Sequence, residues 1–150
     1  MKSAFLLLTC FFLTGCGRPL VAVKETEKDL ALRETLFRWA MVGPKGRQVW
    51  FIDYGNGKDP PPDFLKRFCD LPDPVRNVSE VDKDKFGNVR DHDRARLGYI
   101  VRTRIIRWVD ENTAEVEVEA RHSGLAAHGG KGIARFEDGK WTVRIMPWRA

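Results

Sequence analysis

The residues best suited to acid–base chemistry are a histidine in the C-terminal half of the chain and two residues that end an expected strand in the N-terminal half. His122 lies in phase with the apolar residues Val118 and Ala120, so strand alternation directs its ring toward the interior. If Asp53 or Tyr54 lies near His122 inside the fold, the histidine would act as a positioned acid or base. The alternative is a histidine hydrogen-bonded at a strand end, with no catalytic role.

A second group of candidates consists of carboxylates spaced as in a calcium-binding loop. Asp82, Asp84 and Asp93 fall at positions 1, 3 and 12 of the EF-hand pattern. Phe86 stands at position 5, where an oxygen ligand is needed, and the flanking sequence does not indicate paired helices. We therefore expect a solvated loop without a bound metal, and we expect no cofactor in the chain.

The remaining residues of these reactive types have simpler interpretations. His92 lies in a charged loop, and His128 lies in a glycine-rich segment that is expected to form a turn. Cys69 lies in a short expected helix, which favours a buried, unreactive thiol. The five tryptophans favour core packing; the alternative is an apolar pocket or a patch that faces a partner.

An amphipathic helix is expected to open the folded region. Thr26 is a good helix N-cap with Asp29 at the third helical position, and apolar residues follow at helical spacing until Gly43 and Pro44 end the pattern. Next come a strand over residues 48–54, a short helix over residues 63–70 and a short strand over residues 75–81. Residues 82–98 are charged and typical of a loop.

Two hairpins are expected in the C-terminal half. Residues 98–109 are rich in β-branched and aromatic residues, and in residues 114–122 valine and alanine alternate with glutamate. If Val116 faces Arg107, then Arg104 lies opposite Glu119.

The second hairpin has the stronger turn signal. Asp138-Gly139 is a typical two-residue hairpin turn. The turn predicts three cross-strand pairs: Phe136 with Trp141, Ala134 with Val143, and Glu137 with Lys140.

Together these elements predict an α+β fold in which the N-terminal amphipathic helix packs on a curved antiparallel sheet of four to six strands, with one short extra helix. A sheet with one polar face must bury the other, and the long helix is the cover that the sequence offers. This arrangement resembles the cystatin-like and nuclear-transport-factor-2-like folds. The resemblance implies a roll and no particular activity, because such rolls host binding proteins and enzymes alike.

The N-terminus has the layout of an export signal: Lys2, then the apolar residues 4–13, then small residues before Cys16. The apolar run is too short to cross a membrane, which takes roughly 20 residues. Residues 13–16, Leu-Thr-Gly-Cys, resemble the lipobox of bacterial lipoproteins. The resemblance implies that Cys16 carries a diacylglycerol and that the chain is cut just before it. An ordinary secretory signal cut at the same residues is the alternative.

On this interpretation, residues 1–15 are the lipoprotein signal peptide, residues 16–23 a lipidated tether, and residues 24–150 a single α+β roll domain. Gly17 after the cysteine slightly favours the outer membrane of the cell envelope. The formal charge of +5 falls to +4 when Lys2 leaves with the signal. This dispersed excess favours an anionic lipid or polysaccharide surface, and we expect no nucleic-acid partner.

Several runs of the mature domain resemble a family of small bacterial envelope proteins of unknown function. The resemblance implies a fold and a location and no activity. The runs are residues 49–52, Asp59-Pro60 with residues 64–68, residues 98–108, residues 124–126, and residues 138–141 with Trp148.

Three functional hypotheses follow. The sequence favours a membrane-anchored binding or scaffolding domain, whose partner is an envelope protein, a glycan or a lipid head group. The alternatives are an enzyme that uses His122 with Asp53 or Tyr54 inside the roll, and an inhibitor or immunity protein for a secreted hydrolase or toxin.

Overall fold

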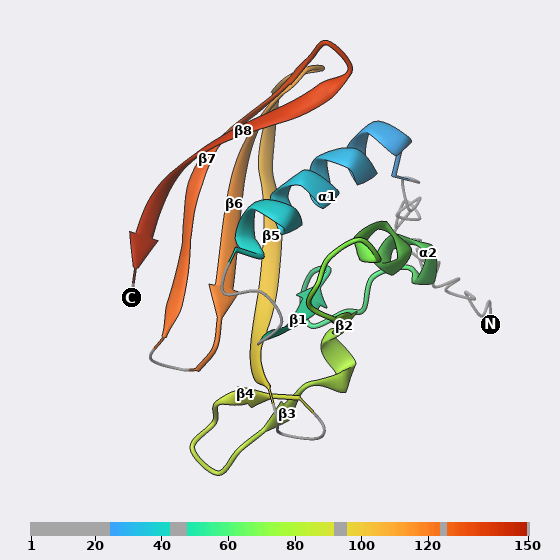
Figure 1. Ribbon diagram of the computed structural model, residues 1–150. Coiled ribbons are helices and arrows are strands. Elements are labelled where there is room, and N and C mark those ends of the chain that lie inside the picture. The colour runs from blue at the N-terminus through green and yellow to red at the C-terminus, as the bar shows by residue number, and fades with distance from the viewer. Residues whose placement is uncertain (1–24, 43–47, 92–95, 124–125, 150) are drawn as a thin grey trace, which may run out of the picture.

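The structure, a computed structural model, describes residues 25–42, 48–91, 96–123 and 126–149. These residues form a mixed α+β fold with one large sheet (Figure 1). The expected signal peptide and tether, Cys16 included, lie outside the described residues, as do the candidates His92 and Asp93.

The longest helix, α1 (Glu27–Ala40), lies across one face of the sheet (Figure 1). Its first turn is closed by a capping box, because the Thr26 hydroxyl accepts the Asp29 N–H at 3.2 Å and the Asp29 carboxylate accepts the Thr26 N–H at 2.9 Å. The buried side chains of α1 recur at helical spacing and belong to the main core: Leu32, Leu36, Phe37 and Ala40.

The other helical elements are α2 (Pro62–Leu65), η1 (Lys66–Phe68) and η2 (Val78–Glu80). The strands are β1 (Gln48–Asp53), β2 (Val75–Asn77), β3 (Asp82–Lys83), β4 (Val89–Arg90), β5 (Leu97–Asp110), β6 (Thr113–Arg121), β7 (Ala127–Glu137) and β8 (Lys140–Arg149).

The sheet has eight strands in the described part of the chain, and its main path runs β2-β1-β5-β6-β7-β8. The sequence predicted a wholly antiparallel sheet. The sheet is instead mixed, because β1 pairs in parallel with both β2 and β5. Parallel neighbours need a crossover connection, and α2 with η1 supplies it between β1 and β2. The strands β3 and β4 raise the count above the expected four to six; they form a small hairpin inside residues 82–98, which were expected to be a loop.

The hairpin of β7 and β8 has the predicted register: Phe136 faces Trp141, Ala134 faces Val143, and Glu137 faces Lys140.

The predicted register of β5 and β6 is wrong. Val116 faces Ile105, and Arg104 faces Glu117, because two register shifts, between Ile105 and Arg107 and between Trp108 and Asp110, leave Ile106 and Val109 as extra residues in β5.

We call the side of the sheet that contacts α1 the inner face and the opposite side the outer face. Strand β6 alternates between them: Val116, Val118 and Ala120 are fully buried in the core with α1, and the glutamates between them point outward. The outer side of β1 has a smaller core of its own, where Val49 and Phe51 pack with Val89 of β4. Neither helix in the described ranges has the length and apolar character that a bilayer crossing needs.

Candidate functional site

Asp53 and Tyr54 both have partners that explain their positions without catalysis. The Asp53 side chain is buried, and its carboxylate accepts the Arg102 guanidinium at 2.5 Å and the backbone N–H groups of Gly55 and Gly57 at 2.9 and 3.0 Å. It therefore caps the turn that follows β1. The Tyr54 hydroxyl donates to the Glu25 carboxylate, and burial together with this bond raises the pKa of the phenol.

His122 lies at the other end of the β1–β5 pair. Its Nδ1 is 2.8 Å from the carbonyl oxygen of Gly98, and because a carbonyl only accepts, Nδ1 carries the proton. Gly98 pairs with Val49, whereas Asp53 pairs with Arg102. Four residues of strand separate the two pairs, a distance of about 13 Å. The structure therefore does not bring His122 together with Asp53 or Tyr54, and the acid–base site considered from the sequence is not assembled.

The acidic segment around Asp84 forms a turn. The Asp84 carboxylate accepts the backbone N–H groups of Phe86 and Asn88 at 2.9 and 3.0 Å and the Asn88 side-chain amide at 2.9 Å. These bonds, the Asn88 side chain first, lower the pKa of Asp84 to about 2. Asp82 accepts the backbone N–H of Lys83 at 2.8 Å. Among the described residues no group of three or more His, Cys, Asp or Glu side chains could hold a metal ion.

Two expectations about single residues need correction. Cys69 is exposed and not buried; it is the residue that ends the short turn of η1, next to the buried Phe68. Core packing accounts for Trp50 and Trp141, but Trp108 and Trp148 keep 42% and 37% of their surface exposed.

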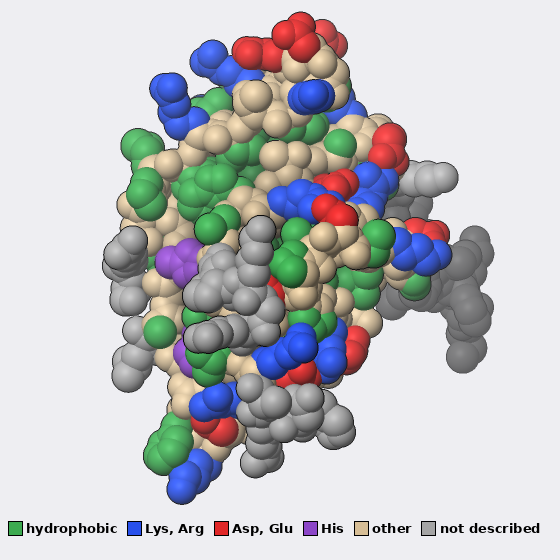
Figure 2. All heavy atoms as spheres, in the orientation of Figure 1, with side chains coloured by type: hydrophobic (Ala, Val, Ile, Leu, Met, Phe, Trp, Pro, Cys, Tyr) green, Lys and Arg blue, Asp and Glu red, His purple; other side chains and the backbone are tan. Residues whose placement is uncertain are grey.

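The exposed Trp148 borders a hollow at one end of the sheet, which we call the aromatic hollow. Its volume is about 300 Å³. It lies between the last turn of α1, the start of β7 and the end of β8, and its lining residues are Trp39, His128, Gly129, Pro147 and Trp148. The segment from Ala127, expected to be a turn, is the beginning of β7, and this is what places His128 in the hollow. Apolar side chains with histidines at their edge gather on this side of the molecule in Figure 2.

A row of rings continues from the aromatic hollow along the sheet. The Tyr99 ring centroid lies 6.2 Å from that of His128, 5.3 Å from that of His122 and 5.1 Å from that of Trp50. Strand alternation places Gln48 on the same face as Trp50, and its buried Oε1 has no hydrogen-bond partner. The inner face thus offers aromatic rings, ring nitrogens and one unpartnered acceptor in the same region.

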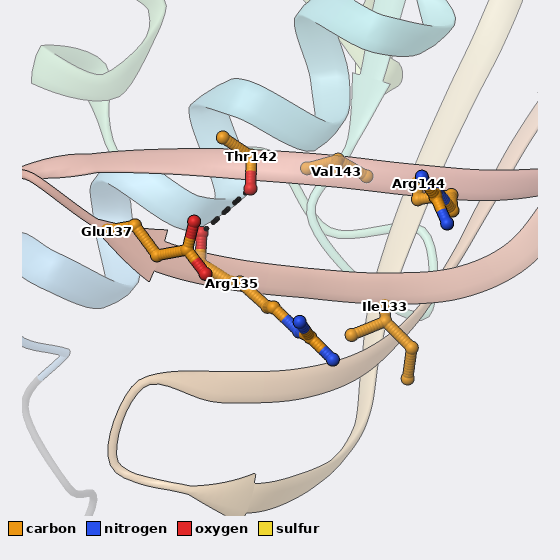
Figure 3. A pocket seen from close by; sticks show the side chains of 6 residues that line it. All are labelled: Ile133, Arg135, Glu137, Thr142, Val143 and Arg144. Atoms are coloured by element: carbon orange, nitrogen blue, oxygen red, sulfur yellow. Dashed lines mark hydrogen bonds between the residues drawn. The ribbon is translucent and has the colours of Figure 1, made fainter.

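A second hollow lies on the outer face of β7 and β8 and has a volume of about 430 Å³. We call it the basic hollow, and Figure 3 shows its lining: Ile133, Arg135, Glu137, Thr142, Val143 and Arg144. Arg135 faces Thr142 and Arg144 faces Ile133, so the two arginines are diagonal neighbours on one face, within about 8 Å of each other. Among the described residues neither guanidinium has a carboxylate within 4.0 Å.

Sequence reasoning missed both hollows, for different reasons. The basic hollow follows from the predicted β7–β8 register, in which Arg135 and Arg144 face uncharged residues. The aromatic hollow depends on how the end of α1 sits against β7 and β8, and no local pattern encodes that contact.

No family model, curated protein or solved structure matches this chain. The functional assignment therefore depends on the residues of the chain itself.

Proposed function

We propose that this protein is a lipid-anchored binding domain of the bacterial cell envelope that holds a sugar unit of an envelope glycan in the aromatic hollow. The observation that carries the binding role is the aromatic hollow itself: Trp148 is exposed beside Trp39 and His128, and the shallow surface is open at one end of the sheet.

The chemistry of the lining favours a sugar over a purely apolar ligand. Tryptophan and proline offer flat apolar surfaces against which the C–H face of a sugar ring can pack. His122, whose Nδ1–H donates to the Gly98 carbonyl oxygen, keeps Nε2 as an acceptor for a hydroxyl group. A ligand rich in hydroxyl groups would satisfy this acceptor, which the fold leaves unused.

The anchor is supported by the sequence. The short apolar run and residues 13–16 supply the export and acylation signals, and acyl chains contribute about 0.8 kcal/mol for each buried CH₂ group, so a diacylglycerol holds the domain at the membrane. The location in the envelope, with the outer membrane slightly favoured, is part of this proposal. We also propose that the fold is a roll similar to the cystatin-like and nuclear-transport-factor-2-like folds, in which α1 shares one core with the inner faces of β5, β6 and β8.

Tryptophan fluorescence during titration with soluble peptidoglycan fragments tests the binding role. The wild-type chain is expected to give a saturable change, and Trp148→Ala and His128→Ala are each expected to weaken binding about tenfold, a loss of about 1.4 kcal/mol. Trp108→Ala is the matched control, because Trp108 is exposed to a similar extent at the other end of the sheet. If Trp148→Ala binds as well as the wild type, the aromatic hollow is not the site.

Mass spectrometry of the native polypeptide tests the anchor separately. The expected product begins at Cys16 and carries a diacylglycerol on its sulfur. An unmodified Cys16, or a chain that retains residues 1–15, would contradict the anchor and leave the sugar-binding test unaffected.

A further inference from the structure

We infer that the outer face of the β7–β8 hairpin is a membrane-docking surface that binds the phosphate groups of anionic lipids through Arg135 and Arg144. The partner is a lipid bilayer, and the surface comprises the basic hollow with the flanking residues Lys131, Lys140 and Met146. The inference rests on the proposed anchor only in that the anchor keeps a bilayer nearby.

The charge of this surface is the first argument. Four cations project from the outer face of β7 and β8: Lys131, Arg135, Lys140 and Arg144. Glu137 is the one carboxylate that lines the basic hollow, and it faces Lys140 across the hairpin. Lys131 Nζ lies 3.8 Å from Glu117 Oε1. This is a long and weak ion pair, so the Lys131 ammonium group can also bind another partner. The surface therefore keeps a positive excess that the fold does not neutralise.

The neighbouring hairpin shows that the same sheet can neutralise such a face. On the outer face of β5 and β6, each described arginine has a carboxylate partner: Arg102 with Asp53, Arg104 with Glu117, Arg107 with Glu115, and Arg121 with Glu119. Of these two hairpins, it is β7–β8 that keeps a positive excess, and an anionic surface would be drawn to it.

The arrangement of the two arginines fits phosphate groups. Guanidinium groups bind phosphate through two parallel N–H donors, and Arg135 and Arg144 lie within about 8 Å of each other on a face that also exposes the Thr142 side chain. In Figure 3 the Arg135 side chain extends from the Glu137 end of the hollow toward Ile133, the residue that Arg144 faces.

An apolar side chain accompanies the cations. Met146 shares the outer face with Arg144 and is 73% exposed. Cations beside an exposed flexible apolar side chain are typical of proteins that lie on a membrane surface, where the apolar group enters the acyl boundary.

The length of the preceding chain brings a bilayer within reach. Residues 16–24 precede Glu25 and span at most about 30 Å when extended. A lipid on Cys16 would therefore hold the hairpin at a high local concentration of head groups, so a weak contact is enough to fix the orientation of the domain.

The test uses the processed chain, residues 16–150, with Cys16→Ser, so that no acyl chain contributes to binding. All described elements lie within this segment, and circular dichroism checks that each variant is folded. In vesicle sedimentation the chain is expected to bind vesicles that contain phosphatidylglycerol and not vesicles of pure phosphatidylcholine. Arg135→Gln with Arg144→Gln should lower the partition coefficient roughly 30-fold.

The matched control is Arg104→Gln with Arg107→Gln, which removes the same formal charge from the neutralised hairpin. This pair is expected to lower binding only about threefold, because Arg104 and Arg107 are already bound to Glu117 and Glu115 and contribute to the net charge of the face without holding a phosphate group. Equal losses in the two double variants would overturn the inference, because net charge alone would then explain binding. Absence of wild-type binding to phosphatidylglycerol would also overturn it, and it would leave the Cys16 mass and the sugar titration to decide the proposed function.

Discussion

The hairpin of β5 and β6 and the hairpin of β7 and β8 belong to one sheet, and they differ in which charged and aromatic side chains remain available to a partner. On the outer face of β5 and β6, the described arginines and glutamates form ion pairs, and on the inner face the β6 side chains are fully buried. On β7 and β8, Arg135 and Arg144 have no carboxylate within 4.0 Å among the described residues, and the strand ends border the aromatic hollow.

This difference separates residues that build the fold from residues that are available to a partner. Exposed ion pairs contribute little to stability, so the pairs on β5 and β6 add little to the free energy of unfolding. Their effect is to cancel a positive charge that would attract anions. The β7–β8 hairpin keeps its positive charge and exposes Trp148, and this is the combination expected of a binding surface.

The largest expected effect concerns the contact between β7 and β8. Gly132 lies between Val116 of β6 and Ile145 of β8, and a Cβ at this position would lie 2.0 Å from the carbonyl oxygen of Arg144. Gly132→Ala must therefore push the backbones apart, and we expect it to lower the free energy of unfolding by about 4 kcal/mol or to prevent folding. Urea denaturation followed by circular dichroism measures the change.

Ala134→Gly in the same strand is the control for this variant. It removes a buried methyl group without a clash and should cost only about 1 kcal/mol. If the two variants are equally stable, β7 does not need the close approach at Gly132.

The second largest expected effect is a difference in stability between variants at the two ends of β8. Trp141 is 8% exposed, packs on Phe136 at 5.3 Å between ring centroids, and donates from Nε1 to the Lys28 carbonyl at 3.1 Å. Trp141→Ala should lower the free energy of unfolding by about 3 kcal/mol, because it leaves a cavity and removes the hydrogen bond to the Lys28 carbonyl. Trp148→Ala should cost less than about 1 kcal/mol, because the Trp148 side chain is exposed in the aromatic hollow.

Thermal unfolding of the two variants measures this difference. A loss of similar size in Trp148→Ala would mean that Trp148 belongs to the core, and the aromatic hollow would then not be a surface available to a ligand.

The fold was predictable where local patterns decide it. Asp138-Gly139 fixes both the turn and the register of its strands, so the pairs from Glu137–Lys140 to Ala134–Val143 follow directly. In β6, apolar residues alternate with glutamates, and this pattern likewise predicts which residues are buried and which are exposed. Successive residues of a strand point to opposite faces of the sheet.

The remainder depends on contacts between distant segments. The extra residues Ile106 and Val109 shift the β5–β6 register, and no local signal marks them. The parallel pairing of β1 depends on which strand a crossover returns to, and hydrophobic alternation does not encode that choice. The candidate site was missed for the same reason: Trp39 and Trp148 are more than a hundred residues apart in the chain and line one hollow.

The smallest expected effect concerns single charges on the two hairpins. A hydrogen bond from Arg107 lowers the pKa of Glu115 below its usual value. A carboxyl with a lowered pKa contributes stability above its unfolded-state pKa, and the contribution is lost as the pH falls through the folded-state pKa. Arg107→Gln should therefore raise the pKa of Glu115 and weaken the acid dependence of stability slightly.

Arg144→Gln is the matched change on the other hairpin, and we expect it to alter neither quantity, because Arg144 has no carboxylate partner among the described residues. Titration of the Glu115 carboxyl carbon by NMR measures the first effect, and urea denaturation at several acidic pH values measures the second. A rise in the pKa of Glu115 in Arg144→Gln would show that the charges of the two hairpins are coupled, and the contrast between a neutralised and an available surface would then fail.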